Sequence, residues 1–339
     1  MSAQKKTPAK LAALLSRHAG ALACIFGDVL PAIWRTGKRP VVFSRRMGLG
    51  DIICTIPAAR ELMKRHEGAA FIYNCHPDFA ALPRLGGVAD RVTTHTDVGG
   101  LSRWNKILLG GFYHFAHGDD VPGQAAQEPM VAEFCRQFGV PVTDEQPLLL
   151  PPPATREKVA ALLTQKNLRT ENLILIHPGP SWTVKEWPSI HWAKLVSELR
   201  TAGFGNIAQV GSARYLGLEK AKLTEVPGVV SLVDELSLEE CVAAFALAKL
   251  FVGIDSGLLH LAAATRTPSV GVWGPTDPRL FYAEKFRAGF LTARVECVGC
   301  EHLKPRQHWF TGCPHSIQCM QSIAPAAVLS ACLKLLVKK

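Results

Sequence analysis

The sequence predicts an α/β protein of two doubly wound parallel-sheet domains, Rossmann-like in pattern, that face one cleft. Its 339 residues are about twice the usual length of one domain. Apolar residues make up 48% of the chain and charged residues 19%, which is the balance of a soluble globular protein. Short apolar runs alternate with segments of helical periodicity, and this alternation is typical of a parallel sheet covered by helices.

Residues 1–36 are expected to form an amphipathic helical segment. Apolar residues recur there near helical spacing, but Arg17, His18 and Asp28 interrupt them, so no run reaches the ~20 apolar residues of a membrane span. The helix either lies at a membrane surface, which the preceding lysines favour, or packs on this protein or a subunit. No cleavage site of a secretory signal is seen, and we expect a cytoplasmic protein, peripheral on the membrane's inner face if the helix binds lipid.

Residues 37–152 are expected to form the first domain. Its strands are predicted at residues 40–44, 71–73 and 91–93. A Gly-rich turn at 47–51 leads into a helix over 52–65, whereas residues 101–127 are poorly patterned. Three consecutive prolines at 151–153 exclude both helix and central strand, so we expect the domain boundary there.

Residues 153–325 are expected to form the second domain, followed by a C-terminal helix over 326–339. Its strands are predicted at residues 173–176, 206–210, 229–233, 250–254 and 269–273. Helices are predicted between them, at residues 188–200, 211–225, 237–248 and 258–264. Ser237 and Glu240 have the spacing of a capping box, which predicts where the third of these helices begins.

The segment Asp255-Ser256-Gly257 joins a predicted buried strand to a helix. Ligands of parallel sheets bind beyond the carboxyl ends of the strands, where helix N-termini offer N–H groups and partial positive charge to phosphate. Gly257 permits close approach, Ser256 can donate a hydroxyl, and His260 lies one turn into the helix. The alternative is an ordinary helix cap.

A second junction of the same kind lies between the predicted strand at 173–176 and the helix that follows. It carries Ser181, Thr183 and Lys185, and the lysine is a flexible cation suited to phosphate. The alternative is a solvated surface lysine. The net charge of +10 also indicates an anionic partner, although charge alone does not say which.

Four of the ten cysteines crowd into one segment near the C-terminus: Cys297, Cys300, Cys313 and Cys319. Their spacing suits a tetrahedral zinc or iron site, for which His302, His308 and His315 are substitute ligands. Reduced thiols are the alternative. Two disulfides would suit a secreted protein, and nothing in the sequence indicates export.

Three stretches together resemble glycosyltransferase family 9, whose best-known members are the ADP-heptose:lipopolysaccharide heptosyltransferases. In sequence order they are Met47-Gly48-Leu49-Gly50-Asp51-Ile52 with Pro57-Ala58, His177-Pro178-Gly179 with Lys185-Glu186-Trp187-Pro188, and Asp255-Ser256-Gly257-Leu258-Leu259-His260-Leu261-Ala262 with Gly274-Pro275-Thr276-Asp277-Pro278. They span residues 40 to about 325 in the expected order.

The resemblance implies a GT-B fold and an inverting transfer of a sugar, heptose from ADP-heptose, to a glycan such as lipopolysaccharide core. The first domain would face the acceptor, with Asp51 as general base. The donor diphosphate would be held by the second domain, by residues Ser181, Thr183, Lys185, Asp255, Ser256, Gly257 and His260. Transfer would need no cofactor, because Lys185 and the helix dipole stabilise the departing nucleotide.

The sequence departs from the family pattern at two places. Arg45-Arg46-Met47 stands where members commonly carry Ser or Thr, and residues 101–127, which should help to form the acceptor face, align with nothing. Three alternatives therefore stay open: an autotransporter-type protein heptosyltransferase, whose branch carries an iron-binding cysteine motif, a GT-B protein without catalysis, and a nucleic-acid-binding protein with a cysteine zinc module. The basic residues are dispersed without an aromatic-basic motif, so no nucleic acid is expected.

Overall fold

The structure, a computed structural model, describes residues 8–46, 48–95, 97–114, 128–143, 145–213, 224–303 and 312–337. Met47 and His308 lie outside the described residues. The chain divides into two units: Met1–Ala116 with Phe134–Pro141, and His117–Glu133 with Val142–Lys339. The domain boundaries expected at residues 36, 152 and 325 stay predictions.

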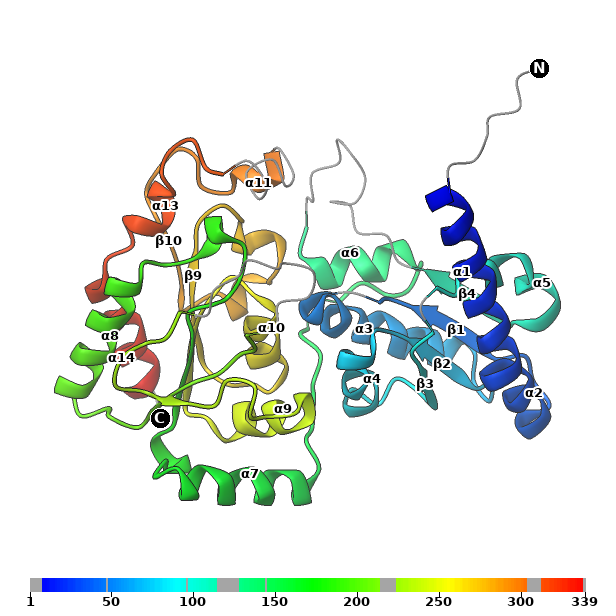
Figure 1. Ribbon diagram of the computed structural model, residues 1–339, viewed down its shortest axis with the longest axis horizontal. Coiled ribbons are helices and arrows are strands. Elements are labelled where there is room, and N and C mark those ends of the chain that lie inside the picture. Colours follow the sequence, from blue (N-terminus) through cyan, green and yellow to red (C-terminus); the bar gives the residue numbers. More distant parts are fainter. Residues whose placement is uncertain are drawn as a thin grey trace. The chain divides into compact units, whose positions relative to one another are not determined.

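The first unit is built on a four-stranded parallel sheet (Figure 1). Its strands are β1 (Val41–Ser44), β2 (Phe71–Asn74), β3 (Arg91–Thr93) and β4 (Gly111–His114), in the order β3-β2-β1-β4. The sequence missed β4, because this edge strand is only partly buried and has no apolar run. The chain runs outward from β1 to β3 and then returns to the other side of β1, so strand order reverses at β1.

Side chains of β1 alternate between the two faces of this sheet. Val42 faces the N-terminal helices, whereas the Phe43 ring lies 5.0 Å from Tyr73 and 5.2 Å from Phe138. Tyr73 also bonds Thr55 of α3 through its hydroxyl, at 2.6 Å. The helices of this unit are α3 (Leu49–Arg65), α4 (Ala81–Leu85), α5 (Asn105–Leu108) and α6 (Met130–Gln137), with 3-10 turns η2 (Pro77–Phe79) and η3 (Gly99–Arg103).

The N-terminal segment is helical, as expected, and packs on the first unit. It comprises α1 (Pro8–Cys24), a π-helical turn η1 (Ile25–Val29) and α2 (Leu30–Thr36). Gly20 is required where α1 meets the loop before η3, because a Cβ there would collide with the Asp97 carbonyl oxygen. The helix Ala12–Thr36 is nevertheless long and apolar enough to cross a membrane, by length and composition alone, although core helices share these properties.

The second unit holds a six-stranded parallel sheet in the order β10-β9-β8-β5-β6-β7. The strands are β5 (Ile174–His177), β6 (Ile207–Gln209), β7 (Val230–Ser231), β8 (Leu250–Ile254), β9 (Ser269–Trp273) and β10 (Phe290–Thr292). Five of these were predicted, and β10 was missed because it is short and at the edge. Together the two sheets confirm the predicted fold class of two parallel-sheet α/β domains.

Helices cover both faces of the second sheet (Figure 1). α8 (Ser189–Thr201) and α14 (Pro325–Val337) lie on one face, and α9 (Leu238–Leu247) and α10 (Gly257–Ala264) on the other, with α7 (Pro153–Gln165) beside α9. The predicted capping box is present, since Ser237 and Glu240 bond each other's backbone at the start of α9. Of the helix expected over 211–225, residues 214–223 lie outside the described part of the chain. The remaining short pieces are α11 (Cys300–Leu303), α13 (Gln318–Gln321) and the 3-10 turns η5 (Thr170–Asn172), η6 (Thr183–Lys185), η7 (Pro278–Leu280) and η8 (Glu284–Phe286).

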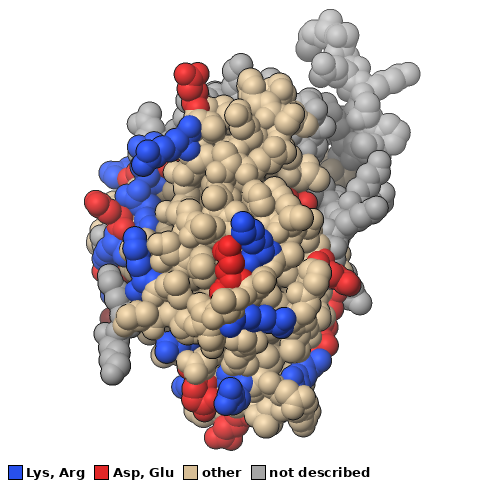
Figure 2. Space-filling view, turned by 90° about the vertical axis from the view of Figure 1, so that its left-hand side faces the viewer, with Lys and Arg blue, Asp and Glu red and all other residues tan. Residues whose placement is uncertain are grey.

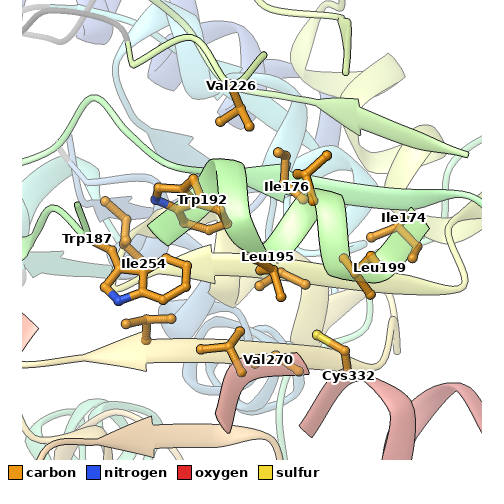
Figure 3. Close-up of a cluster of buried hydrophobic side chains, with 14 of the residues drawn as sticks. Ile174, Ile176, Trp187, Trp192, Leu195, Leu199, Val226, Ile254, Val270 and Cys332 are labelled. Carbon is orange, nitrogen blue, oxygen red and sulfur yellow. The ribbon is translucent and has the colours of Figure 1, made fainter. Parts of the chain in front are cut away.

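The core under α8 is built from apolar side chains at helical spacing (Figure 3). Trp192, Leu195 and Leu199 of α8 lie over the aliphatic side chains of β5. Trp187 joins this core from the loop before α8, and its Nε1 donates to the Ile323 carbonyl at 2.9 Å. Because a fully buried tryptophan anchors the loop, the segment carrying Lys185 is held firmly above the sheet.

Candidate functional site

The two loops that the sequence predicted to bind a ligand follow adjacent strands of the second sheet. From β5 the chain runs outward to β7 and then returns to β8 on the other side of β5. The register pairs Ile176 with Val252 and His177 with Gly253, so the two strands end side by side. The point where strand order reverses opens a crevice at the carboxyl ends of the strands, which is where open parallel sheets bind ligands.

A buried ion pair joins these loops. The Lys185 ammonium donates to Asp255 Oδ2 at 2.6 Å, and the side chains are only 11% and 7% exposed. The Thr276 hydroxyl, which follows β9, donates to the same carboxylate oxygen at 2.5 Å. Three consecutive strands of the sheet thus each contribute one group to the network, and the carboxylate holds the lysine in place at the crevice.

Ser256 occupies the N-cap position of α10 but does not cap the helix. Its side chain makes no cap hydrogen bond, and its Oγ is buried without a hydrogen-bond partner among the described residues. A buried hydroxyl of this kind is unusual, because nearly all such groups are paired in folded proteins. Gly257 begins the helix directly behind it, so a hydroxyl and the helix N-terminus lie next to each other.

The other predicted donor-binding residues differ in exposure. Ser181 is buried and Thr183 is exposed. The Ser181 N–H lies 3.4 Å from Glu186 Oε1, and burial raises the pKa of that carboxyl. His260 is buried, and its ring stacks on Tyr282 with the centroids 4.7 Å apart.

His177 ends β5 beneath the crevice as a neutral histidine. Its Nδ1 donates to the Val210 carbonyl at 3.0 Å. Complete burial lowers its pKa to about 4, although this hydrogen bond opposes the shift. The residue therefore adds no positive charge near neutral pH.

In the first unit, Asp51 lies in the turn after β1, where the order of that sheet reverses. Its carboxylate forms an ion pair with the Arg45 guanidinium, and the side chains are 24% and 13% exposed. Gly48, with φ of +82°, is the N-cap of α3, so Asp51 is the third residue of the helix rather than its cap. A Cβ at Gly48 would lie 2.5 Å from Asp51 Oδ2, which shows how closely the carboxylate folds over the turn.

The four clustered cysteines lie in one region of the second unit. Cys300 and Cys319 each feel the charges of the other three, and burial together with these charges raises the pKa of Cys300 to about 11 and of Cys319 to about 12. Among the described residues, however, no three His, Cys, Asp or Glu side chains are arranged to hold a metal ion. The thiols gather, then, without forming a ligand set.

The cysteine segment packs on the loop that carries Thr276. The Gly299 N–H donates to the Gly274 carbonyl at 3.0 Å, and the Glu301 N–H donates to Pro275 at 2.9 Å. A Cβ at Gly274 would lie 2.8 Å from Cys319 Sγ. The cysteines therefore support one wall of the candidate site.

Sequence reasoning named most of these groups but missed two. Thr276 follows a predicted strand, and its position at the carboxyl edge was the signal that could have identified it. Arg45 was noted only as a departure from a pattern, because its pairing with Asp51 across a turn has no periodic signature.

Comparison with known proteins gives a consistent result. The sequence profile of glycosyltransferase family 9 (heptosyltransferase) matches residues 111–309. Lipopolysaccharide heptosyltransferase 1 of Pseudomonas aeruginosa is 32% identical over 321 residues, which cover 77% of this chain and 85% of the relative. The enzyme of the same name from Escherichia coli K12 is 25% identical over 290 residues, which cover 71% and 89%.

Solved structures share the fold. Escherichia coli ADP-heptose LPS heptosyltransferase II has a TM-score of 0.66 at 18% identity, covering 88% of this chain and 99% of that one. The iron-containing dodecameric glycosyltransferase TibC of enterotoxigenic E. coli has a TM-score of 0.65 at 18% identity, covering 88% and 76%. These similarities confirm the GT-B fold.

Proposed function

We propose that this chain, which belongs to glycosyltransferase family 9 and is a glycosyltransferase, transfers a heptose from ADP-heptose to the lipopolysaccharide core. The relatives named above carry this activity in their names, and the match with the Pseudomonas enzyme extends over most of both chains. The donor would bind the second unit, and the acceptor hydroxyl would be activated from the first.

The observation that supports a diphosphate donor is the network of Lys185, Asp255 and Thr276 at the crevice of the second sheet. In the proposed site, the Ser256 hydroxyl and the N-terminus of α10 donate to the phosphates. Lys185 supplies the positive charge that stabilises the departing ADP. The transfer itself then needs no cofactor.

Asp51 is proposed as the general base. In an inverting transfer, the acceptor oxygen attacks the anomeric carbon as its bond to the phosphate breaks, and the hydroxyl proton must go to a base. A partly exposed carboxylate in the turn after β1 is suited to accept that proton. Its partner Arg45 holds it in place, in a way that a Ser or Thr there would not.

The experiment that tests this proposal is calorimetric titration of the protein with ADP, UDP and GDP, followed by transfer assays with ADP-heptose. We expect ADP to bind most tightly and heptose to pass to a lipopolysaccharide core acceptor. Equal affinity for the three nucleotides would contradict the proposed donor, and transfer to protein but not to glycan would contradict the proposed acceptor.

A protein acceptor is the second candidate, and the cysteine segment is the observation that favours it. The similar structure TibC is iron-containing by its title, and the four thiols of this chain lie close enough to raise one another's pKa. We therefore retain a structural zinc or iron ion at Cys297, Cys300, Cys313 and Cys319 as a proposal. Its role would be to hold the segment against the Thr276 loop.

We place the reaction on the cytoplasmic side of the membrane, where a nucleotide sugar and a growing lipid-linked acceptor meet. The enzyme would associate with the membrane peripherally. A role in nucleic-acid binding finds no support, because the strongest candidate site holds one cation paired with a carboxylate rather than a basic surface.

A further inference from the structure

The solvent-facing side of the N-terminal helix is apolar. Its large exposed side chains follow one another at intervals of seven and then four residues, as one stripe does along a helix. They are Leu15 (62% exposed), Leu22 (49%), Phe26 (67%), Leu30 (39%) and Trp34 (91%). The smaller exposed residues between them, Ala19, Ala23, Gly27 and Pro31, are also uncharged.

The opposite side of the same helix is already occupied. Ala21, Cys24, Ile25, Val29 and Ala32 lie in the core of the first unit, against Val42 and Ile72 of its sheet. Asp28 is buried there as well, paired with Arg91 of β3. A surface helix normally turns polar residues to water, and one that is apolar all round is covered on all sides.

Charges of one sign surround this stripe. Residues 8–40 contain one acid, the buried Asp28, and five bases: Lys10, Arg17, Arg35, Lys38 and Arg39. η3 packs on α1, and after it come the exposed bases Arg103 and Lys106 with Trp104 (42% exposed) and Ile107 (62%). Arg39 donates to the Lys106 carbonyl at 3.0 Å, which brings α5 to the end of α2.

This combination is confined to the first unit. On the face of the molecule shown in Figure 2, basic and acidic side chains are interspersed. The apolar residue Ile190 of α8 is 74% exposed, which is normal for a single surface side chain. A stripe of five with a basic rim needs an explanation that Ile190 does not.

We propose that the stripe Leu15–Trp34 and the adjacent Trp104 and Ile107 form a lipid-binding face that lies on an anionic phospholipid surface. The apolar side chains would enter the region below the headgroups, the two tryptophans would lie at headgroup depth, and the basic rim would contact the phosphates. A second copy of the chain fits less well, because two identical basic rims would face each other and repel. The inference rests on the peripheral membrane association proposed above.

The test is flotation of the full chain with vesicles, without donor or acceptor. We expect binding to vesicles of phosphatidylglycerol and phosphatidylethanolamine, little binding to phosphatidylcholine alone, and loss of most binding when salt rises from about 0.1 M to about 1 M. The double variant Phe26→Ser, Trp34→Ser should bind at least about tenfold more weakly. Ile190→Ser, a matched exposed apolar residue on the other unit, should bind as the wild type does.

Circular dichroism and ADP affinity check that the double variant is folded, and they separate this test from that of the donor site. Equal binding by the double variant and the wild type would overturn the proposal, as would equal binding to both lipid mixtures or to neither. Sedimentation equilibrium provides the remaining arm. A wild-type dimer that becomes monomeric in the double variant would assign the stripe to a second copy instead.

Discussion

Replacing Lys185 by methionine separates the proposed diphosphate site from a merely structural ion pair. The side chain is 11% exposed, and its ammonium lies 2.6 Å from Asp255 Oδ2. Methionine has a similar volume but no charge, so the variant removes one charge-assisted contact to phosphate. Such a contact contributes about 1.5–3 kcal/mol, and the Kd for ADP should rise roughly 10- to 150-fold.

The same substitution should also lower stability, because it leaves the Asp255 carboxylate buried without its cation. Breaking a buried pair in this way costs about 3–5 kcal/mol. Adding Asp255→Asn removes the orphaned charge and keeps an oxygen that can accept from Thr276. We therefore expect the double variant Lys185→Met, Asp255→Asn to recover most of the lost melting temperature.

The affinity for ADP should not recover with the stability. Calorimetry and thermal melts on the wild type, the single variant and the double variant measure both quantities, and Lys194→Ala, an exposed lysine on α8, is the control that should change neither. Recovery of ADP affinity together with melting temperature would show that Lys185 only balances Asp255. An unchanged Kd in the single variant would remove Lys185 from the site altogether.

Three further predictions test other parts of the molecule. Asp51→Asn should reduce turnover about 10²–10⁴-fold with nearly unchanged ADP affinity, and near-normal turnover in the transfer assay would leave Asp51 without a role as base. Metal analysis of protein purified without chelator should find about one zinc or iron per chain, lost in Cys297→Ser, Cys300→Ser; four thiols that all titrate without bound metal would contradict this. Burial holds the pKa of His177 at about 4, below its unfolded value near 6.5, so the unfolded chain takes up the proton first as pH falls. Stability is therefore full above about pH 6.5 and falls by up to about 3 kcal/mol toward pH 4, and melts of His177→Gln should lack this component.

Much of the fold follows from local pattern in the sequence. Five strands of the second sheet were predicted because their apolar runs are bounded by turns and helices, and α9 because Ser237 and Glu240 form a capping box. The edge strands β4 and β10 were missed. Edge strands are partly exposed, so their residues need not be apolar and the periodic signal is weak.

The sequence by itself determined the fold class and the residue types of the candidate site, because strand–helix junctions and their polar residues are readable along the chain. Only the tertiary structure decided which of these residues meet. Lys185 and Asp255 are 70 residues apart in sequence, and the order of the strands brings their loops to adjacent strand ends. The exposed stripe of the N-terminal helix is likewise a tertiary property: periodicity shows that residues share a face, but only packing shows which face the protein has already buried.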